Sequence, residues 1–220
     1  MQTKVVCLDL LVSSNRWRSE YHLFAKRLLV TKFPSVALHE VVEESTRAIN
    51  PVEYKAKFLF LGLENIESAT GDIVNVSEVT ANEVRSRSKV FKTNDILFGR
   101  LRPYLRKCTV IESPITDGLC STEFIILECK PQLILSHYLR EILISTPIIE
   151  RISSMQSGAA LPRVSAKDLL KTKIPLPPIS EQERIVSRLS ELKTERMMLM
   201  RKISEIQSVC ENEISSIFNS

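Results

Sequence analysis

The sequence predicts an α+β fold, with a mixed, mainly β domain over residues 1–178 and one long C-terminal coiled-coil helix over residues 179–220. Three observations predict it. Short apolar runs separated by turn residues fill residues 36–130, which is typical of strands. A proline-rich segment then keeps residues 174–179 extended. Beyond that segment no glycine or proline occurs up to Ile217, and apolar residues recur at spacings of four and three, which indicates a heptad helix.

The composition is that of a globular chain, with 220 residues, 44% hydrophobic and 25% charged. These values exclude collagen, a disordered chain and a disulfide-stapled miniprotein. The longest unbroken apolar run, Phe58 to Leu63, is far shorter than the roughly 20 residues that cross a bilayer. The segment Met1 to Val12 favours a strand over a signal peptide, because Asp9 interrupts it and no small-residue cleavage site follows. We therefore expect a cytoplasmic protein with no membrane span.

Local patterns predict the individual strands and short helices. Residues 1–35 indicate a short strand and a helix that ends before Pro34. The candidate strands are Phe58–Leu63, Ile73–Val76, Val90–Phe91, Ile96–Phe98, Cys108–Ile111 and Phe124–Leu127. Turns are expected between them, at Gly71, Asn94-Asp95, Pro114 and Asp117-Gly118. Residues 136–153 predict two short helices, with Pro147 in the first turn of the second, and Ser165 predicts the cap of a third.

The C-terminal helix has a clear start and a continuous seam. Ser180 stands three residues before Glu183 in a capping-box arrangement, which predicts that the helix begins at Glu181. Up to Ile217 the helix would be about 55 Å long at 1.5 Å per residue. The apolar seam positions are Ile185, Leu189, Leu192, Leu199, Ile203, Ile206, Cys210 and Ile217, and the two charged seam positions are Arg196 and Glu213.

A seam of this length is more than a small domain can cover, so we expect the helix to pack on another helix of comparable length. The charges at Arg196 and Glu213 disfavour unselective pairing of this seam with other apolar helices. The alternative is a C-terminal helix folded back along its own domain.

Positive charge is concentrated between Arg85 and Lys107, where eight basic residues stand against one acid, Asp95. Because each Lys or Arg that displaces a counterion favours binding to phosphates, this segment predicts contact with double-stranded DNA. Five of the eight are Arg, whose planar fork also matches the O6 and N7 acceptors of guanine. The candidate DNA-binding residues are Arg85, Arg87, Lys89, Arg100, Arg102, Tyr104, Arg106 and Lys107.

These candidates fall into two groups. Arg100, Arg102 and Arg106, with Tyr104 among them, follow the strand at residues 96–98, and the first two share a face if that strand continues. The second group, spaced by two residues and expected on one strand face, is Arg85, Arg87 and Lys89. The alternative is a solvated face, or a folding element in which the leucines are buried and one arginine pairs with an acid.

Enzymatic signatures in the sequence are short or absent. Asp117, Glu128 and Lys130 have the spacing of a D…E-x-K nuclease, in which two carboxylates bind magnesium, although the pattern is short and also fits a solvated strand end. The five cysteines include no C-x-x-C pair and the three histidines lie far apart, so we expect reduced thiols and no metal or cofactor. The Asn50-Pro51-Val52-Glu53 segment departs from the N-P-P-Y loop of amino-methyltransferases, and glycine-rich nucleotide loops are absent.

Four segments together resemble the specificity subunit of type I restriction-modification systems. They are Val90 to Leu105 (VFKTNDILFGRLRPYL), Gly118 to Leu127 (GLCSTEFIIL), Ser157 to Pro178 (SGAALPRVSAKDLLKTKIPLPP) and Ile179 to Val186 (ISEQERIV). The segments Arg16 to Tyr21 and Phe60 to Ser68 (FLGLENIES) resemble the target recognition domain of that family as well. The resemblance extends from about residue 16 to residue 217.

The resemblance implies a DNA-recognising subunit without catalytic chemistry. In this family, each target recognition domain binds one half of a split DNA site. Long helical spacers pack antiparallel and form the docking surface for adenine methyltransferase subunits, and endonuclease subunits join through the methyltransferases. Family members usually contain two recognition domains and two spacers, whereas this sequence has one of each and resembles a half-subunit.

Two copies are then expected to pair as a homodimer through their Glu181 to Ile217 helices, which predicts a palindromic, interrupted target. The alternative is a truncation whose other half lies on another chain. The sequence therefore allows three functions. In order of preference, they are a non-catalytic DNA specificity and scaffold subunit, a magnesium-dependent nuclease, and a coiled-coil interaction protein whose basic segment is solvated.

Overall fold

The computed structural model describes residues 31–218 except Lys55, Ala81, Arg85 and Ala159, and the side chain of Ser216 is also left undescribed. The strand and helix expected in residues 1–35 lie almost entirely outside the described residues, as does Arg85. The predicted α+β class is confirmed: sheets and short helices are followed by one long C-terminal helix. The chain divides into two compact units, the first ending at Ile179 and the second running from Ser180 to Ser220.

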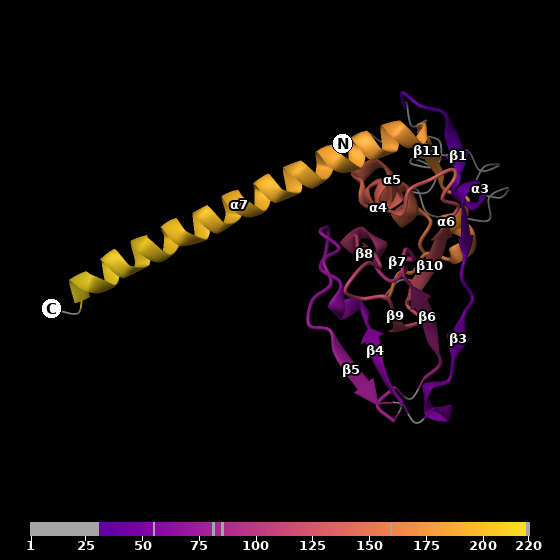
Figure 1. Cartoon of the computed structure of the whole chain (residues 1–220), viewed down its shortest axis with the longest axis horizontal. Coiled ribbons are helices and arrows are strands. Elements are labelled where there is room, and N and C mark those ends of the chain that lie inside the picture. The colour runs from indigo at the N-terminus through magenta and orange to yellow at the C-terminus, as the bar shows by residue number, and fades with distance from the viewer. Residues whose placement is uncertain (1–30, 55, 81, 85, 159, 219–220) are drawn as a thin grey trace. The chain divides into compact units, whose positions relative to one another are not determined.

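Among its described residues, the first unit contains three sheets. A two-stranded sheet pairs β1 (Ser35–Ala37) with β11 (Lys173–Pro175). A four-stranded sheet has the order β2 (Val42–Glu44), β10 (Phe124–Cys129), β7 (Ile96–Gly99) and β8 (Cys108–Val110). A five-stranded sheet has the order β3 (Ala48–Ile49), β6 (Ser88–Lys92), β9 (Asp117–Cys120), β4 (Lys57–Leu61) and β5 (Ser77–Thr80). All pairs are antiparallel except β4 with β9. Figure 1 shows the four-stranded sheet between the five-stranded sheet and the short helices.

The two larger sheets share one hydrophobic core. Phe91 and Leu61 come from the five-stranded sheet, Leu97 and Phe124 from the four-stranded sheet, and all four side chains are completely buried. Each such side chain contributes roughly 1.5–3 kcal/mol to stability. In β7 and β10 the apolar residues are consecutive and buried, which is expected of central strands covered on both faces. This shared core fixes the end of β7, from which the basic segment continues.

Two of the predicted local assignments are wrong. Residues Ile73–Val76 form no strand, because the side-chain amide of Asn65 donates to the carbonyls of Val74 (3.2 Å) and Asn75 (2.9 Å) and uses the acceptors that a sheet would need. Asp117 and Gly118 begin β9 instead of forming a turn. A Cβ atom on Gly118 would lie 2.6 Å from the Leu59 carbonyl oxygen, so the glycine allows β9 to pack closely between its neighbours.

The short helices confirm the predictions made for them. The two helices expected in residues 136–153 are α4 (Ser136–Ile144) and α5 (Thr146–Ser154), with a proline in the first turn of α5. Ser165 caps α6 (Ala166–Leu170), since its hydroxyl accepts a hydrogen bond of 3.0 Å from the Asp168 amide. One helix that was not predicted, α3 (Leu38–Val41), is a single turn between β1 and β2.

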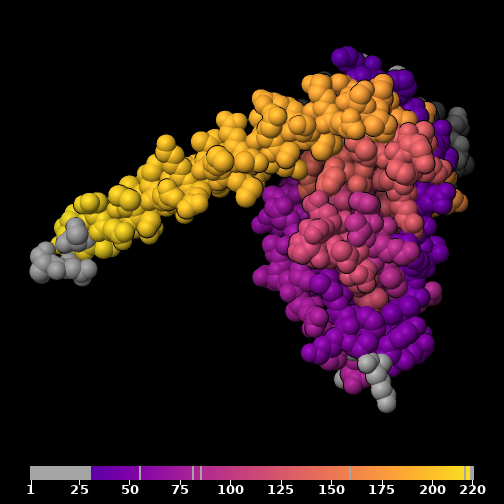
Figure 2. All heavy atoms as spheres, viewed as in Figure 1, coloured from indigo at the N-terminus to yellow at the C-terminus, as the bar shows by residue number. Residues whose placement is uncertain are grey.

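The second unit is the helix α7, whose bounds are Ile179–Phe218. It starts two residues before the predicted Glu181, directly after Pro178, where the missing amide hydrogen of proline removes no intrahelical hydrogen bond. The helix is 40 residues long and Figure 2 draws it as a rod of side chains. Ion pairs one turn apart support it, as in Arg188–Glu191 at 2.8 Å and Arg201–Glu205 at 3.1 Å. Within the described part of the chain, no helix is both long enough and apolar enough to span a bilayer.

Candidate nucleic-acid interface

Residues 100–107 form one loop between β7 and β8, which we call the basic loop. Gly99 at the end of β7 donates an amide hydrogen bond of 2.8 Å to the Lys107 carbonyl, so the two ends of the loop are held together. The condition under which Arg100 and Arg102 would share a strand face is not met, since β7 ends at Gly99. The loop brings Arg100, Arg102, Tyr104, Arg106 and Lys107 together, as five of the eight DNA-binding candidates.

A short 3₁₀ helix, η3 (Pro103–Leu105), forms the tip of the basic loop between two strained residues. Arg102 has φ 50° and Arg106 has φ 55°, a left-handed conformation that is unfavourable for residues with a side chain. Such conformations typically destabilise by roughly 1–3 kcal/mol and persist where the surroundings determine them. Here the Arg102 amide donates to the Pro162 carbonyl at 2.8 Å and the Arg106 amide to the Pro103 carbonyl at 2.9 Å.

The side chains of the basic loop differ in their engagement with the protein. Arg106 donates from Nη2 to Thr146 Oγ1 at 3.1 Å, and Lys107 donates from Nζ to the Leu63 carbonyl at 2.7 Å. Arg102 is exposed and Tyr104 is 50% exposed. Arg100 is half-buried, and its Nε atom has no hydrogen-bond partner among the described residues. Arg102 and Tyr104 are therefore the loop side chains best placed to meet a ligand from solvent.

A second loop, residues 157–164, holds the basic loop in place. The Val164 amide donates to the Arg100 carbonyl at 3.0 Å, and Ser157 and Arg163 exchange two backbone hydrogen bonds of 2.8 Å. Leu101 and Arg163 also form an isolated antiparallel bridge. The two loops therefore form one backbone platform, with the exposed Leu161 at its edge.

An ion pair between Glu123 and Arg163 fixes this platform from the side. Arg163 donates from Nε to both carboxylate oxygens at 3.0 Å and from Nη2 to one of them at 2.8 Å. These hydrogen bonds lower the pKa of Glu123. Partial burial raises that pKa, and the charges of Arg163 and Arg100 lower it further. The Glu123 carbonyl also accepts the Arg100 amide at 2.9 Å. The sequence carries no signal of this pair, because its members lie 40 residues apart.

The second predicted group does not share one strand face. Only Lys89 lies within β6, and its ammonium is 3.8 Å from the Glu44 carboxylate. Arg87 is exposed and precedes the strand, because β6 begins at Ser88. Arg85 lies outside the described residues. Arg87 is therefore the one described member of this group that is both exposed and outside the sheet.

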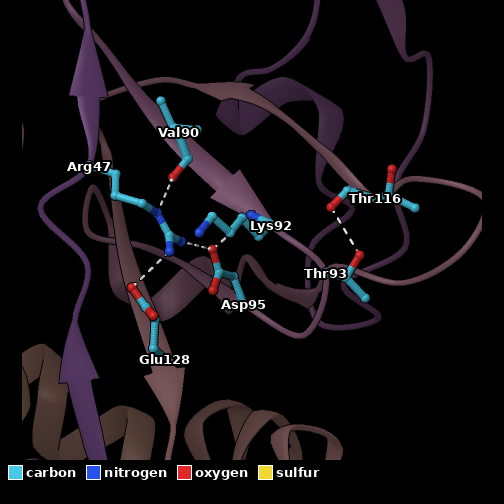
Figure 3. A network of polar contacts seen from close by, with 7 residues as sticks. All are labelled: Arg47, Val90, Lys92, Thr93, Asp95, Thr116 and Glu128. Atoms are coloured by element: carbon cyan, nitrogen blue, oxygen red, sulfur yellow. Dashed lines mark hydrogen bonds and ion pairs between the residues drawn. The ribbon is translucent and has the colours of Figure 1, made fainter.

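The single acid of the basic segment, Asp95, has a structural role. Arg47 contacts the carboxylates of both Asp95 and Glu128, the latter at 3.1 Å, and approaches the Val90 carbonyl at 3.4 Å (Figure 3). Burial raises the pKa of Asp95, while the hydrogen bond from the Lys92 amide and the charge of Arg47 oppose that shift. Because Val90 lies in β6 and Glu128 in β10, Arg47 links the two larger sheets.

The residues of the nuclease alternative are engaged in separate contacts. Asp117 starts β9 and accepts a hydrogen bond of 2.9 Å from Thr116 Oγ1, whereas Glu128 lies in the other large sheet and pairs with Arg47. Lys130 donates to the Glu40 carbonyl at 3.2 Å. Within the part of the chain that the structure describes, no three His, Cys, Asp or Glu residues are grouped so that they could hold a metal ion. The structure therefore gives no support to this alternative.

The described cysteines are free thiols and mostly sequestered. Burial raises the pKa of Cys108, Cys120 and Cys129 to about 12, so these thiols stay protonated and unreactive near neutral pH. Cys210, on α7, is exposed. These positions agree with the expectation of reduced thiols.

The first unit is a sheet scaffold that carries an arginine-rich, hydrogen-bonded loop, and the second unit is a long helix. Comparisons with known proteins assign this chain to a class. Residues 51–208 match the family model of the type I restriction modification DNA specificity domain. The chain belongs to this family. Among individual relatives, it is 29% identical over 153 residues to the type I restriction enzyme EcoDI specificity subunit of Escherichia coli, covering 70% of this chain and 33% of that protein.

Solved structures give the same class. The crystal structure of the HsdS subunit from Thermoanaerobacter tengcongensis matches with a TM-score of 0.71 and 28% identity, over 82% of this chain and 48% of that one. The type I restriction-modification S subunit from M. genitalium matches in fold alone, with a TM-score of 0.51 and 16% identity, over 77% of this chain and 41% of that one. The chain is a type I specificity subunit with one target recognition domain, and it spans a third to a half of the length of these relatives.

Proposed function

We propose that this chain is the sequence-specific DNA-binding component of a type I restriction-modification system, and that its first unit recognises one half of a bipartite target. The observation that carries the proposal is the basic loop, an arginine-rich loop held by backbone hydrogen bonds, with Arg102 and Tyr104 exposed, in a chain of the DNA specificity family. The subunit has no catalytic role of its own. We place its work in the cytoplasm, where it meets the DNA.

The chemistry of the basic loop suits a duplex. Arg102 supplies a planar fork that binds a phosphate or the O6 and N7 acceptors of guanine. The Tyr104 hydroxyl donates to a phosphate from the same turn. Because η3 and its hydrogen bonds hold this turn before DNA arrives, little conformational entropy is lost on binding. Arg87 adds a further exposed cation on the first unit.

We assign the helix α7 to assembly. We propose that two copies of the chain pair through their α7 helices, so that two identical recognition domains bind an interrupted, palindromic target. The paired helices serve as the docking surface for adenine methyltransferase subunits, and endonuclease subunits join through the methyltransferases.

Binding of a mixed-sequence duplex, measured against salt concentration, tests the DNA role. The expected result is binding that weakens steeply as salt rises, with a slope that falls by roughly one for each phosphate contact removed. Replacing Arg100, Arg102 and Arg106 together by alanine should abolish most of this binding. Arg201→Ala, which removes one exposed arginine from α7, is the matched control and should bind DNA as the unmodified chain does.

The same preparation distinguishes the other two functions. Incubation of plasmid DNA with magnesium should leave the DNA intact. Nicking that disappears in Glu128→Ala would instead establish a nuclease. If the triple alanine variant binds duplex DNA as well as the unmodified chain, the basic loop does not contact DNA. The chain would then be an interaction protein whose basic segment is solvated.

A further inference from the structure

Arg100 is a half-buried arginine whose guanidinium forms no ion pair with any described carboxylate. Its Nε atom is buried and has no hydrogen-bond partner among the described residues. Its backbone is fixed, because its amide donates to the Glu123 carbonyl at 2.9 Å and its carbonyl accepts the Val164 amide at 3.0 Å. A buried donor that lacks a partner is unfavourable, so an acceptor from outside the chain would be bound well at this position.

Glu123 is the carboxylate that the fold places beside Arg100. The register of β7 and β10 pairs Gly99 with Phe124, so Arg100 and Glu123 follow as the next neighbours across the two chains. Besides the hydrogen bonds from Arg163, the charge of Arg100 lowers the pKa of Glu123, so the two groups are close in space. Arg163 nevertheless occupies both carboxylate oxygens, with hydrogen bonds of 3.0, 3.0 and 2.8 Å. The two arginines thus compete for one carboxylate, and Arg163 holds it.

This cluster of three charged groups carries a net positive charge. Arg163 and Glu123 neutralise each other at 2.8 Å, whereas the charge of Arg100 has no ion-pair partner in the described part of the chain. Two residues further along the basic loop, the exposed Arg102 adds another cation. A guanidinium binds an oxyanion through two parallel hydrogen bonds, which are stronger than bonds between neutral groups. The ligand that this cluster fits is therefore an oxyanion.

The depth of Arg100 in the protein favours a phosphate over a base. Base edges lie on the floor of the DNA grooves, about 8.5 Å deep in the major groove, so a side chain must project from the protein to reach them. Arg100 is half-buried up to its covered Nε atom and does not project in this way. Phosphates line the outside of the duplex, where most protein contacts to DNA are made. A recessed arginine therefore meets the DNA backbone first.

We propose that Arg100 binds one backbone phosphate of the duplex, and that Arg163 keeps Arg100 available by occupying the Glu123 carboxylate. The inference rests on the DNA role of the proposed function. It adds which residue anchors the DNA backbone and what prevents neutralisation of that residue within the chain. Arg163 is a positioning residue in this arrangement, because it acts on DNA binding through Glu123 and Arg100. Without Arg163, the Glu123 carboxylate pairs with Arg100 and competes with the phosphate.

Removal of the Arg100 charge tests the phosphate contact. Arg100→Met keeps an apolar stem at the half-buried position, so the variant should fold, as checked by urea unfolding. Duplex binding by the full chain should weaken roughly tenfold, and by the same factor for two duplexes of unrelated sequence. The slope of log affinity against log salt should decrease by roughly one. Arg100→Lys keeps the charge without the planar fork, so its slope should equal that of the unmodified chain.

Removal of Arg163 tests the competition for Glu123. In Arg163→Ala the carboxylate pairs with Arg100, so duplex binding should weaken roughly tenfold and the salt slope should decrease by roughly one, as in Arg100→Met. Adding Glu123→Gln removes the competitor, so the double variant should recover the slope and bind within about threefold of Glu123→Gln alone. The matched control is Arg163→Ala with Glu112→Gln, which makes the same charge change at a carboxylate that is 65% exposed and should recover neither.

The outcomes separate this inference from the proposed function. If folded Arg100→Met binds duplex DNA with unchanged affinity and slope, the phosphate contact is overturned and the DNA role of the chain stands. If Glu123→Gln fails to rescue Arg163→Ala, or if Glu112→Gln rescues it equally well, the competition for Glu123 is overturned. If the unmodified chain shows no salt-dependent duplex binding, the DNA role itself is overturned, and the inference falls with it.

Discussion

The pair formed by Glu123 and Arg163 shows how single residues hold the recognition surface. Glu123 touches the basic loop through its carbonyl, which accepts the Arg100 amide, and touches the 157–164 loop through its carboxylate. Both residues lie outside the basic loop, which comprises residues 100–107. They therefore position the arginines that we assign to DNA, instead of contacting DNA themselves.

Glu123→Gln should weaken DNA binding without abolishing it. The variant keeps the backbone contact to Arg100 but loses the charged hydrogen bonds to Arg163, and folding stability should fall by about 1 kcal/mol because the pair is partly exposed to solvent. Arg163→Lys is the companion variant, since it keeps the charge but not the bidentate geometry. Duplex titration and urea unfolding give the two readouts. Unchanged DNA affinity in both variants would show that the pair serves stability alone.

The pKa of Glu123 predicts how stability depends on pH. Because hydrogen bonds from Arg163 lower that pKa in the folded chain, the unfolded chain binds more protons at acidic pH. The stabilisation from this group is fully present above the pKa of the unfolded carboxyl and is lost as pH falls through the folded value. Between about pH 6 and about pH 3, the free energy of unfolding, measured with urea, should decrease less in Glu123→Gln than in the unmodified chain. An identical acid limb in both proteins would contradict this assignment.

The left-handed conformation of Arg102 predicts a separation of function from stability. Glycine adopts φ 50° without strain, so Arg102→Gly should leave folding stability unchanged or raise it by up to about 1 kcal/mol. The same variant loses the guanidinium and should bind duplex DNA more weakly. Arg102→Ala is the control, because it loses the side chain and keeps the strain. Loss of stability in the glycine variant alone would show that the conformation is not strained.

At the scale of elements, β9 depends on the absence of a side chain at Gly118. A methyl group there would approach the Leu59 carbonyl oxygen and the Phe91 ring, and neither is a flexible surface group. Gly118→Ala should therefore destabilise the first unit by roughly 1–3 kcal/mol, measurable as a lower urea midpoint with an unchanged slope. If Gly118→Ala were as stable as the original chain, β4 and β6 would be able to move apart and make room for the methyl group, which would contradict this prediction.

Elements specified by local signals were predictable, whereas those specified by distant contacts were not. Pro147 and Ser165 mark helix starts within a few residues of chain, and the corresponding helices are present. The heptad pattern likewise predicted α7, apart from its first two residues. By contrast, β9 forms only because β4 and β6 flank it, and the amide of Asn65 prevents a strand about ten residues away.

The candidate site was predictable in composition but not in geometry. The sequence indicated the cluster of basic residues from Arg100 to Lys107, and the structure gathers them in one loop. It could not indicate that Arg102 and Arg106 take left-handed conformations, since few residues other than glycine and asparagine favour them. Nor could it indicate the contact of Arg163 with Glu123, because ion pairs between distant segments leave no periodic signal.

At the scale of the whole molecule, the two units differ in structure and in proposed role. The first unit carries the sheets, the shared core and the basic loop, and the second consists of α7. In the proposed function, DNA recognition belongs to the first unit and assembly to the second. Substitutions in the α7 seam should therefore change the assembly state while the affinity of one recognition domain for one half-site is retained.

Selection from a randomised pool of duplex DNA tests the central claim most directly. The chain is incubated with the pool, bound duplexes are recovered and sequenced, and the selection is repeated with Arg102→Ala. The account predicts enrichment of one short motif, present as two inverted copies separated by a spacer of unspecified sequence, and weaker enrichment for the variant. Recovery of duplexes with no enriched motif, at any salt concentration that permits binding, would contradict it.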